Sequence, residues 1–215
     1  MQGVNVWRER LSRWFYPAAL RCPLSPNAIT ILALLLNMAA ALALAFGRVH
    51  PPLFLAAILL IAIAGLADAF DGIVARAQQK STRFGDFLDH LADRVSDSLV
   101  LIGWAWGSGV RPSLVIAATF VVLINGYSGT QLEASFGDRS YEGLGRGEFV
   151  LALVIFPIIS WCLAVAGATG VRAGPFRTAE WLTLLLIAAA LLGISQRIRL
   201  AARLSGSAEP SRDDS

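Results

Sequence analysis

Long apolar runs, separated by short polar or turn-forming segments, dominate the hydrophobic pattern of this chain. A helix needs about 20 predominantly apolar residues to cross the hydrocarbon core of a bilayer. Six runs reach that length: 27–46, 53–79, 84–106, 112–132, 148–167 and 179–200. Proline or glycine, which favour turns, precede several of them, as at Pro51-Pro52 and Gly174-Pro175. The pattern predicts an all-α membrane protein with six transmembrane helices.

The chain before the first run has an amphipathic pattern of its own. Its apolar stripe consists of Val4, Trp7, Leu11 and Trp14. Arginines lie off this stripe, which predicts a helix in the membrane interface within residues 1–22, ending at Pro17. Residues 205–215 are polar and lack an apolar stripe, so we expect a disordered tail there. The membrane domain then spans residues 23–204.

The composition supports a membrane protein and excludes several other classes. Of the 215 residues, 56% are hydrophobic and 15% charged, and the mean hydropathy is +0.62. A soluble globular domain carries about 25% charged residues. Cys22 and Cys162 are isolated in the sequence, so neither a zinc motif nor a disulfide framework can be read. The formal net charge is small, at +3, and we expect no nucleic-acid partner.

Basic residues are distributed unequally between the two sides of the predicted bundle. The segments on the side of both termini carry 13 arginines and lysines, and the opposite segments carry 4. Positively charged loops tend to remain in the cytosol. We therefore expect a multi-pass protein of a prokaryotic cell membrane, with both termini and the 76–83 loop in the cytosol.

Aspartates interrupt the second and third apolar runs. They are Asp68, Asp71, Asp86, Asp89, Asp93 and Asp97. A carboxylate in mid-bilayer costs about 2.5–3.5 kcal/mol on insertion scales, so these groups need water, a cation or a basic partner. Asp68 and Asp71 are three residues apart, and Asp89 and Asp93 are four apart, so each pair shares one helix face. The helix rise places both pairs at a similar depth near the cytosolic side.

These acids have two interpretations. Four carboxylates at one depth form a hard, oxygen-rich site that suits Mg²⁺ or Mn²⁺. Alternatively, they are solvated helix-end charges or partners of Arg76, Arg83 and Arg94. Gly72 and Gly85 favour the metal site, because a glycine leaves space where a ligand or another helix approaches the backbone.

Residues 68–93 contain a recognisable signature. The sequence reads Asp68-x2-Asp71-Gly72-x2-Ala75-Arg76-x8-Gly85-x3-Asp89-x3-Asp93. This pattern resembles the CDP-alcohol phosphotransferase family, with every fixed position of the motif filled. The six predicted spans, the amphipathic N-terminal segment and the stretch 25–30 are also similar to that family. The resemblance covers nearly all of residues 5–204.

The resemblance implies a magnesium-dependent enzyme of phospholipid biosynthesis. Such an enzyme transfers a substituted phosphate from a CDP-linked donor, here CDP-diacylglycerol, to the hydroxyl of a polar alcohol and releases CMP. By this likeness Asp68, Asp71, Asp89 and Asp93 ligate the metal, and Asp93 is also the candidate base for the acceptor hydroxyl. The CDP pocket would be lined by Gly72, Ala75, Arg76, Gly85, Asn27 and Thr30. The family also implies a homodimer.

Arginines suggest which alcohol accepts the phosphate. Arg94 follows Asp93 directly, and further arginines lie on the same predicted side: Arg139, Arg146, Arg197 and Arg199. Arginine suits bidentate recognition of phosphate. The family's inositol phosphate branch is similar in having an arginine directly after the last acid of the motif and another at the start of the fifth span. This likeness favours inositol phosphate as the acceptor. The alternative is that these arginines only follow the positive-inside bias and contact lipid headgroups.

Two other functions stay open. The default interpretation of His90, directly after Asp89, is a structural role. The Asp-His pair at this position is, however, similar to the sequence of the family's aminoalcohol branch. That branch joins CDP-ethanolamine or CDP-choline to diacylglycerol. Buried acids also mark cation pathways, so a cation-coupled transporter is the alternative of another class. Against a transporter, spans four to six lack a second set of acids to complete a route, and no inverted repeat is seen.

Overall fold

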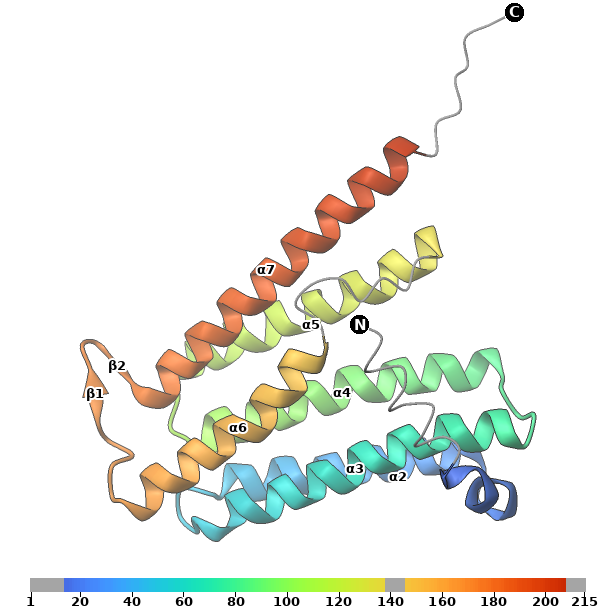
Figure 1. Ribbon diagram of the computed structural model, residues 1–215. Coiled ribbons are helices and arrows are strands. Elements are labelled where there is room, and N and C mark those ends of the chain that lie inside the picture. The colour runs from blue at the N-terminus through green and yellow to red at the C-terminus, as the bar shows by residue number, and fades with distance from the viewer. Residues whose placement is uncertain (1–13, 138–145, 208–215) are drawn as a thin grey trace, which may run out of the picture.

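Figure 1 shows the computed structural model, which describes residues 14–137 and 146–207. A short helix covers residues 14–21. Six long helices follow: α2 (Pro26–Ala45), α3 (Pro52–Ala77), α4 (Arg83–Gly107), α5 (Pro112–Phe136), α6 (Arg146–Val165) and α7 (Thr178–Ser207). Between α6 and α7 lies an antiparallel hairpin of two short strands, β1 (Arg172–Ala173) and β2 (Phe176–Arg177).

All six predicted apolar segments are helical, and each helix begins within two residues of its predicted start. Within the described residues, α2, α3, α5 and α7 are long and apolar enough to cross a membrane. The apolar part of α6 is shorter, at Leu151–Val165, and acids interrupt α4. The chain is therefore a helical integral membrane protein, while membrane crossing by α4 and α6 stays a prediction.

The hairpin departs from the expected all-α fold. Gly174 adopts a φ of 63° between the two strands. Tight two-residue hairpin turns need such a left-handed residue, and glycine adopts it without steric cost. The apolar pattern missed this element because each strand is only two residues long.

The helix over residues 14–21 also differs from expectation, because it runs through Pro17 instead of ending there. Proline lacks an N–H and its ring crowds the carbonyl four residues before it, but the turns that follow it can still form. Tertiary contacts hold this segment: Ala19 is fully buried, and Gln78 Nε2 donates to the carbonyl oxygens of Ala19 and Cys22, each at 2.9 Å.

The two chain ends lie largely beyond what the structure describes. Residues 1–13 carry most of the predicted amphipathic stripe and lie outside the described residues. The same holds for residues 208–215 of the predicted tail. Helix α7 continues to Ser207, three residues beyond the predicted boundary of the membrane domain at 204.

Helix α2 packs against both α3 and α4, and two glycines make the contact with α4 very close. A Cβ atom added to Gly103 would clash with the carbonyl oxygen of Ala41, and one added to Gly107 would clash with that of Leu44. Small residues allow helix backbones to approach in membranes, where van der Waals packing drives association. The α2–α4 pair is therefore joined tightly at the C-terminal end of α4.

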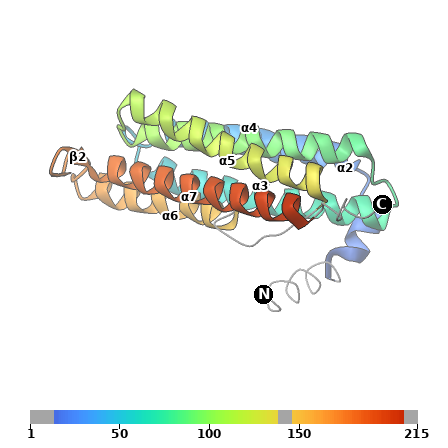
Figure 2. The ribbon, with the colours of Figure 1, turned by 90° about the horizontal axis from the view of Figure 1, so that it is seen from above.

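The remaining helices pack around this pair. Helix α5 packs against α7 and α6 against α3, in a broadly common direction (Figure 2). The fully buried Trp104 on α4 donates from its indole Nε1 to Ser160 Oγ on α6 at 3.0 Å. Figure 1 also shows α5 and α7 rising away from α3 and α4 toward the C-terminal end of α7.

Candidate functional site

Three aspartates from α3 and α4 converge near the turn that joins these helices. One carboxylate oxygen from each of Asp68, Asp71 and Asp89 lies within 4.8 Å of the other two. Thr82 Oγ1 accepts a hydrogen bond from the N–H of Gly85 at 3.0 Å, which caps the first turn of α4. This cap fixes the start of the helix that carries Asp89. The structure thus joins residues that the spacing alone placed only at a similar depth.

A second group of ligand atoms shares Asp89. One ligand atom from each of Asp89, His90 and Asp93 lies within 4.8 Å of the others. The sequence favoured a structural role for His90, whereas its imidazole lies beside both carboxylates. The available signal was the spacing of His90 and Asp93, which are three residues apart and so share one side of a helix.

Helix α2 contributes a hydroxyl to the cluster. Thr30 Oγ1 donates to Asp71 Oδ2 at 2.7 Å, and both side chains are buried. The start of α2 is itself well defined, because Ser25 Oγ accepts a hydrogen bond from the N–H of Ala28 at 3.2 Å and Pro26 opens the helix. Thr30 therefore orients Asp71, a more specific role than lining a pocket.

The donor set fits a hard divalent cation. All ligand atoms of the Asp68–Asp71–Asp89 group are carboxylate oxygens, which Mg²⁺ and Mn²⁺ prefer. Carboxylates this close repel one another when ionised, so a cation between them lowers the electrostatic energy. Burial of Asp71 and Asp93, which are 7% and 5% exposed, weakens solvent screening of that repulsion. The arrangement is therefore an aspartate-rich group whose ligand atoms suit a divalent cation.

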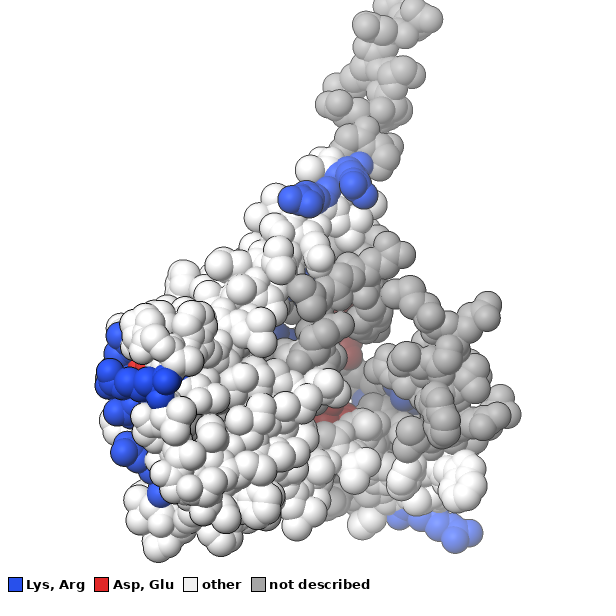
Figure 3. Space-filling model, turned by 60° about the vertical axis from the view of Figure 1, so that its left-hand side comes forward, with Lys and Arg blue, Asp and Glu red and all other residues white. Residues whose placement is uncertain are grey.

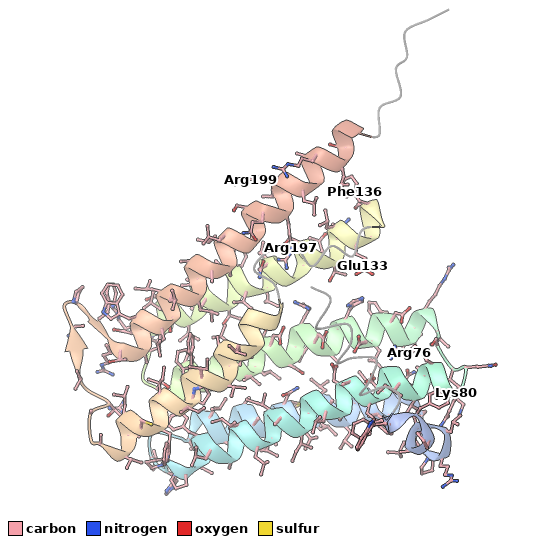
Figure 4. The ribbon with its side chains drawn as sticks, viewed as in Figure 1. Arg76, Lys80, Glu133, Phe136, Arg197 and Arg199 are labelled. Atoms are coloured by element: carbon pink, nitrogen blue, oxygen red, sulfur yellow. The ribbon has the colours of Figure 1, made fainter. Side chains whose placement is uncertain are left out.

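Two glycines shape the surroundings of this site. A Cβ atom on Gly85 would lie 3.3 Å from Asn27 Oδ1, so the absence of a side chain lets the start of α2 approach α4. A Cβ atom on Gly72 would lie 3.5 Å from Arg76 Nη1, which shows that Arg76 folds back along its own helix. Figure 4 places Arg76 near the end of α3, and Ala75 beside it is half-buried. Of the predicted CDP pocket, Thr30 thus contacts an acid directly, Asn27 lies beside Gly85, and Gly72, Ala75 and Arg76 follow Asp71 along α3.

A small cavity of about 80 Å³ extends from the acids into the bundle. Its polar lining consists of Thr30, Asn37, Asp68, Asp93, Ser96 and Asp97. Asp97 lies one helical turn beyond Asp93 and is 8% exposed. The sequence pattern points to Asp97 but gives it no role. It does not point to Asn37 or Ser96, because a single polar residue in an apolar run forms no pattern.

Arg94 enters the interface between α4 and α5. A side chain at Gly126 of α5 would overlap its guanidinium group, so the glycine makes room for the arginine. Its Nη1 lies 3.8 Å from Asp97 Oδ2, a pair on one helix face. Its Nε is buried and has no hydrogen-bond partner among the residues described. The protein thus holds Arg94 in place, while its Nε donor has no partner among the described residues.

Arg197 reaches from α7 toward α5 (Figure 4). Its Nη1 donates to the carbonyl oxygen of Asn125 at 2.7 Å and also to Asn125 Oδ1. A Cβ atom on Gly129 would lie 3.3 Å from Arg197 Nε. Because Gly126 and Gly129 are one turn apart on α5, the side chains of Arg94 and Arg197 lie beside each other. The positive-inside bias alone does not explain this inward orientation.

The other predicted arginines are not part of this group as far as the structure describes them. Arg199 is exposed on α7. Arg139 lies outside the described residues, as does the side chain of Arg146 at the start of α6.

Comparisons with known proteins agree with these features. A family model described as CDP-alcohol phosphatidyltransferase matches residues 23–192. The phosphatidylinositol phosphate synthase of Mycobacterium marinum is 33% identical over 156 residues, which is 66% of this chain and 64%, just under two thirds, of that protein. The enzyme of the same name from Mycobacteroides abscessus is 33% identical over 208 residues, covering 92% of this chain and 87% of that protein.

A solved structure has the same fold. The phosphatidylinositol phosphate synthase of Mycobacterium tuberculosis, in a crystal structure with CDP-DAG bound, aligns with a TM-score of 0.67 and 26% identity. The alignment covers 95% of this chain and 100% of that chain. The same protein has been crystallised in complex with manganese and citrate, with the same TM-score of 0.67.

Proposed function

Because the chain belongs to the CDP-alcohol phosphatidyltransferase family, we propose that it transfers the phosphatidyl group of CDP-diacylglycerol to a hydroxyl of inositol phosphate. CMP is the second product. The observation that carries this proposal is the convergence of Asp68, Asp71 and Asp89 next to Asp93. The names of the mycobacterial relatives and the donor bound in the solved structure support the choice of substrates.

The proposed metal ligands are Asp68, Asp71 and Asp89, with Asp93 adjoining them. Bound Mg²⁺ or Mn²⁺ would supply positive charge that stabilises the pyrophosphate and the departing CMP. Thr30 keeps Asp71 in place through its hydrogen bond. The manganese complex of the solved relative supports a divalent cation here.

Asp93 is the proposed general base. The acceptor oxygen forms a bond to the phosphorus that carries diacylglycerol, while the bond from that phosphorus to the oxygen of CMP breaks. The electron pair of the broken bond leaves with CMP, and the hydroxyl proton passes to the Asp93 carboxylate. Asp93 is only 5% exposed, so bulk water competes little for this position.

The CDP group is proposed to bind around Gly72, Ala75, Arg76, Gly85 and Asn27. The missing side chains of the two glycines let Arg76 and Asn27 lie close to the backbone, at the positions where they would contact the CDP group. Arg76 supplies an exposed positive charge close to Gly72, which suits a pyrophosphate.

Arg94 and Arg197 are the proposed recognition groups for the phosphate of the acceptor. They lie side by side beyond Asp93, and arginine binds phosphate through two parallel hydrogen bonds. Arg94 retains a buried donor that has no partner in the described part of the chain. This feature favours an acceptor carrying phosphate over free inositol, serine or diacylglycerol.

The surroundings of the proposed enzyme follow from the charge distribution. The excess of arginine on one side supports an active site that opens to the cytosol. The polar CDP group then enters from water, while the acyl chains of the donor remain in the bilayer. A homodimer, common in the family, is part of the proposal.

The test is CMP release by the detergent-purified protein with CDP-diacylglycerol and Mn²⁺ or Mg²⁺. Parallel reactions contain inositol phosphate, inositol, glycerol phosphate or serine, and we expect turnover with inositol phosphate to exceed the others. Asp93→Asn should lose activity, whereas Asp86→Asn, an exposed acid on the same helix, should keep it. Turnover with CDP-ethanolamine or CDP-choline and diacylglycerol instead would establish the aminoalcohol alternative. Cation flux in liposomes without CMP release would establish a transporter.

A further inference from the structure

A basic hollow lies at the end of the bundle away from the aspartates. It has a volume of about 530 Å³ where α2, α4, α5 and the hairpin meet. Four arginines line it: Arg48, Arg111, Arg172 and Arg177. These are the only basic residues assigned to the minority side of the predicted bundle. Figure 3 shows basic side chains gathered on this face of the molecule.

Carboxylates of the described residues balance only part of the charge of this basic hollow. Glu180 is its only acidic lining residue, and both carboxylate oxygens are occupied. Oε1 accepts from Arg111 Nε at 2.7 Å, and Oε2 accepts from the backbone N–H of Arg177 at 2.8 Å. In the ranges 14–137 and 146–207, no carboxylate forms an ion pair with Arg48 or Arg172. One carboxylate among four guanidinium groups leaves an excess of three positive charges.

Two of the guanidinium groups are held close together. A Cβ atom on Gly109 would lie 3.0 Å from Arg177 Nη1 and 3.3 Å from Arg48 Nη1, so both nitrogens border the same point. Arg177 Nη1 is fixed there by donating to the carbonyl oxygen of Gly109 at 3.1 Å. Like charges at this separation repel, and an anion that accepts hydrogen bonds from both would relieve the repulsion.

The position of the basic hollow indicates the source of that anion. Ser108, the C-cap of α4, follows Asp93 by 15 residues, or about 22 Å of helix. Trp106 lines the hollow and is 66% exposed, and Trp181 near the start of α7 is 46% exposed. Exposed tryptophans at helix ends are typical of the membrane–water interface. Apolar lining at Ala45 and Val110 adjoins the arginines.

We propose that this basic hollow binds the phosphate headgroup of an anionic phospholipid, in the leaflet opposite the aspartate site. The arginines hold the phosphate, and the apolar lining contacts the first segments of the acyl chains. This site is separate from the proposed active site, and its assignment does not depend on the proposed reaction.

The test uses the full-length protein, delipidated in detergent and titrated with phosphatidylglycerol or with phosphatidylcholine of the same chains. Bound lipid is counted by native mass spectrometry, and the unfolding temperature is recorded alongside. We expect phosphatidylglycerol to bind and stabilise, and Arg48→Gln/Arg172→Gln to weaken binding at least about tenfold. The control Arg21→Gln/Arg203→Gln removes the same charge from exposed sites elsewhere and should bind like the wild type.

Other outcomes would overturn the proposal. They are equal binding by the double variant and the wild type, equal loss in the control, and equal binding of phosphatidylcholine. Displacement of the lipid by equimolar inorganic phosphate would instead indicate a site for a free anion. If the double variant does not fold, the single substitutions Arg48→Gln and Arg172→Gln are each expected to weaken phosphatidylglycerol binding, and wild-type binding by both would refute the site.

Discussion

Replacing Thr30 by valine removes one hydroxyl group and changes the shape of the side chain little. That hydroxyl donates to Asp71 Oδ2 at 2.7 Å in a buried position. A hydrogen bond to a charged group contributes about 1.5–3 kcal/mol, and loss of a partner behind a metal ligand costs about 10- to 100-fold in metal affinity. We therefore expect Thr30→Val to raise the Mn²⁺ concentration for half-maximal CMP release by about 10- to 100-fold. Saturating Mn²⁺ should largely restore turnover.

The assay is a Mn²⁺ titration of CMP release, paired with direct Mn²⁺ binding measured by electron paramagnetic resonance. Thr30→Ser keeps the hydroxyl and should behave like the wild type. Thr119→Val is the matched control, because Thr119 Oγ1 donates to the carbonyl oxygen of Val115 in its own helix, at 2.8 Å, away from the acids. Equal Mn²⁺ requirements for Thr30→Val and Thr119→Val would refute the positioning role of Thr30.

Four further predictions concern other parts of the molecule. Asp93→Asn should lower CMP release by about 10²- to 10⁴-fold, the usual contribution of a general base, while CDP-diacylglycerol still binds in a direct binding assay. Arg197→Lys should raise the KM for inositol phosphate by about tenfold or more but not the KM for CDP-diacylglycerol, because lysine loses the planar fork. Gly103→Leu should lower the free energy of unfolding by at least about 1–3 kcal/mol in thermal denaturation, because it overpacks the α2–α4 contact. With both native cysteines replaced, Thr82→Cys should react with an impermeant thiol reagent only from the cytosolic side and Ser113→Cys only from the opposite side.

Each of these four predictions has a control variant or an outcome that would contradict it. A loss of donor affinity in Asp93→Asn as large as that in Asp68→Asn would make Asp93 mainly a metal ligand. Arg199→Lys is the control for Arg197, and an equal rise in KM would mean a general charge effect. Gly170→Leu has open space around it and should be far less destabilising than Gly103→Leu. Labelling of Thr82→Cys from outside intact cells would invert the orientation and remove the argument for a cytosolic site.

The helical part of the fold could be predicted from the sequence because lipid imposes a strict rule. Every backbone polar group in hydrocarbon must be paired within its own helix, so an apolar run of sufficient length is nearly always helical. The hairpin and the helical turn through Pro17 escaped this rule, because contacts distant in sequence stabilise them. The bond from Gln78 to the carbonyl oxygen of Ala19 spans 59 residues and leaves no local signal.

The candidate site could likewise be predicted only in part from the sequence. Asp68, Asp71, Asp89 and Asp93 stood out because acids are costly in apolar runs, and their spacing set their helix faces. Thr30 and Arg197 could be named as candidates, but the contacts that they make and the other polar partners on α2 and α5 could not be predicted, since a single polar residue has no period. Asn125, which accepts two hydrogen bonds from Arg197, is an example.

The glycine contact between α2 and α4 fastens these two helices to each other near the C-terminal end of α4. Gly103 is ten residues beyond Asp93, so the backbones are fastened about 15 Å from the proposed base. Thr30 on α2 and the acids on α4 are thereby kept in fixed register. Arg197 belongs to the α5–α7 pair, which rises away from these two helices (Figure 1). A tilt of that pair would change the distance between Arg197 and the acids while the distances among the aspartates of α4 stayed constant, so the proposed acceptor site would change separately from the part of the proposed metal site that α4 carries.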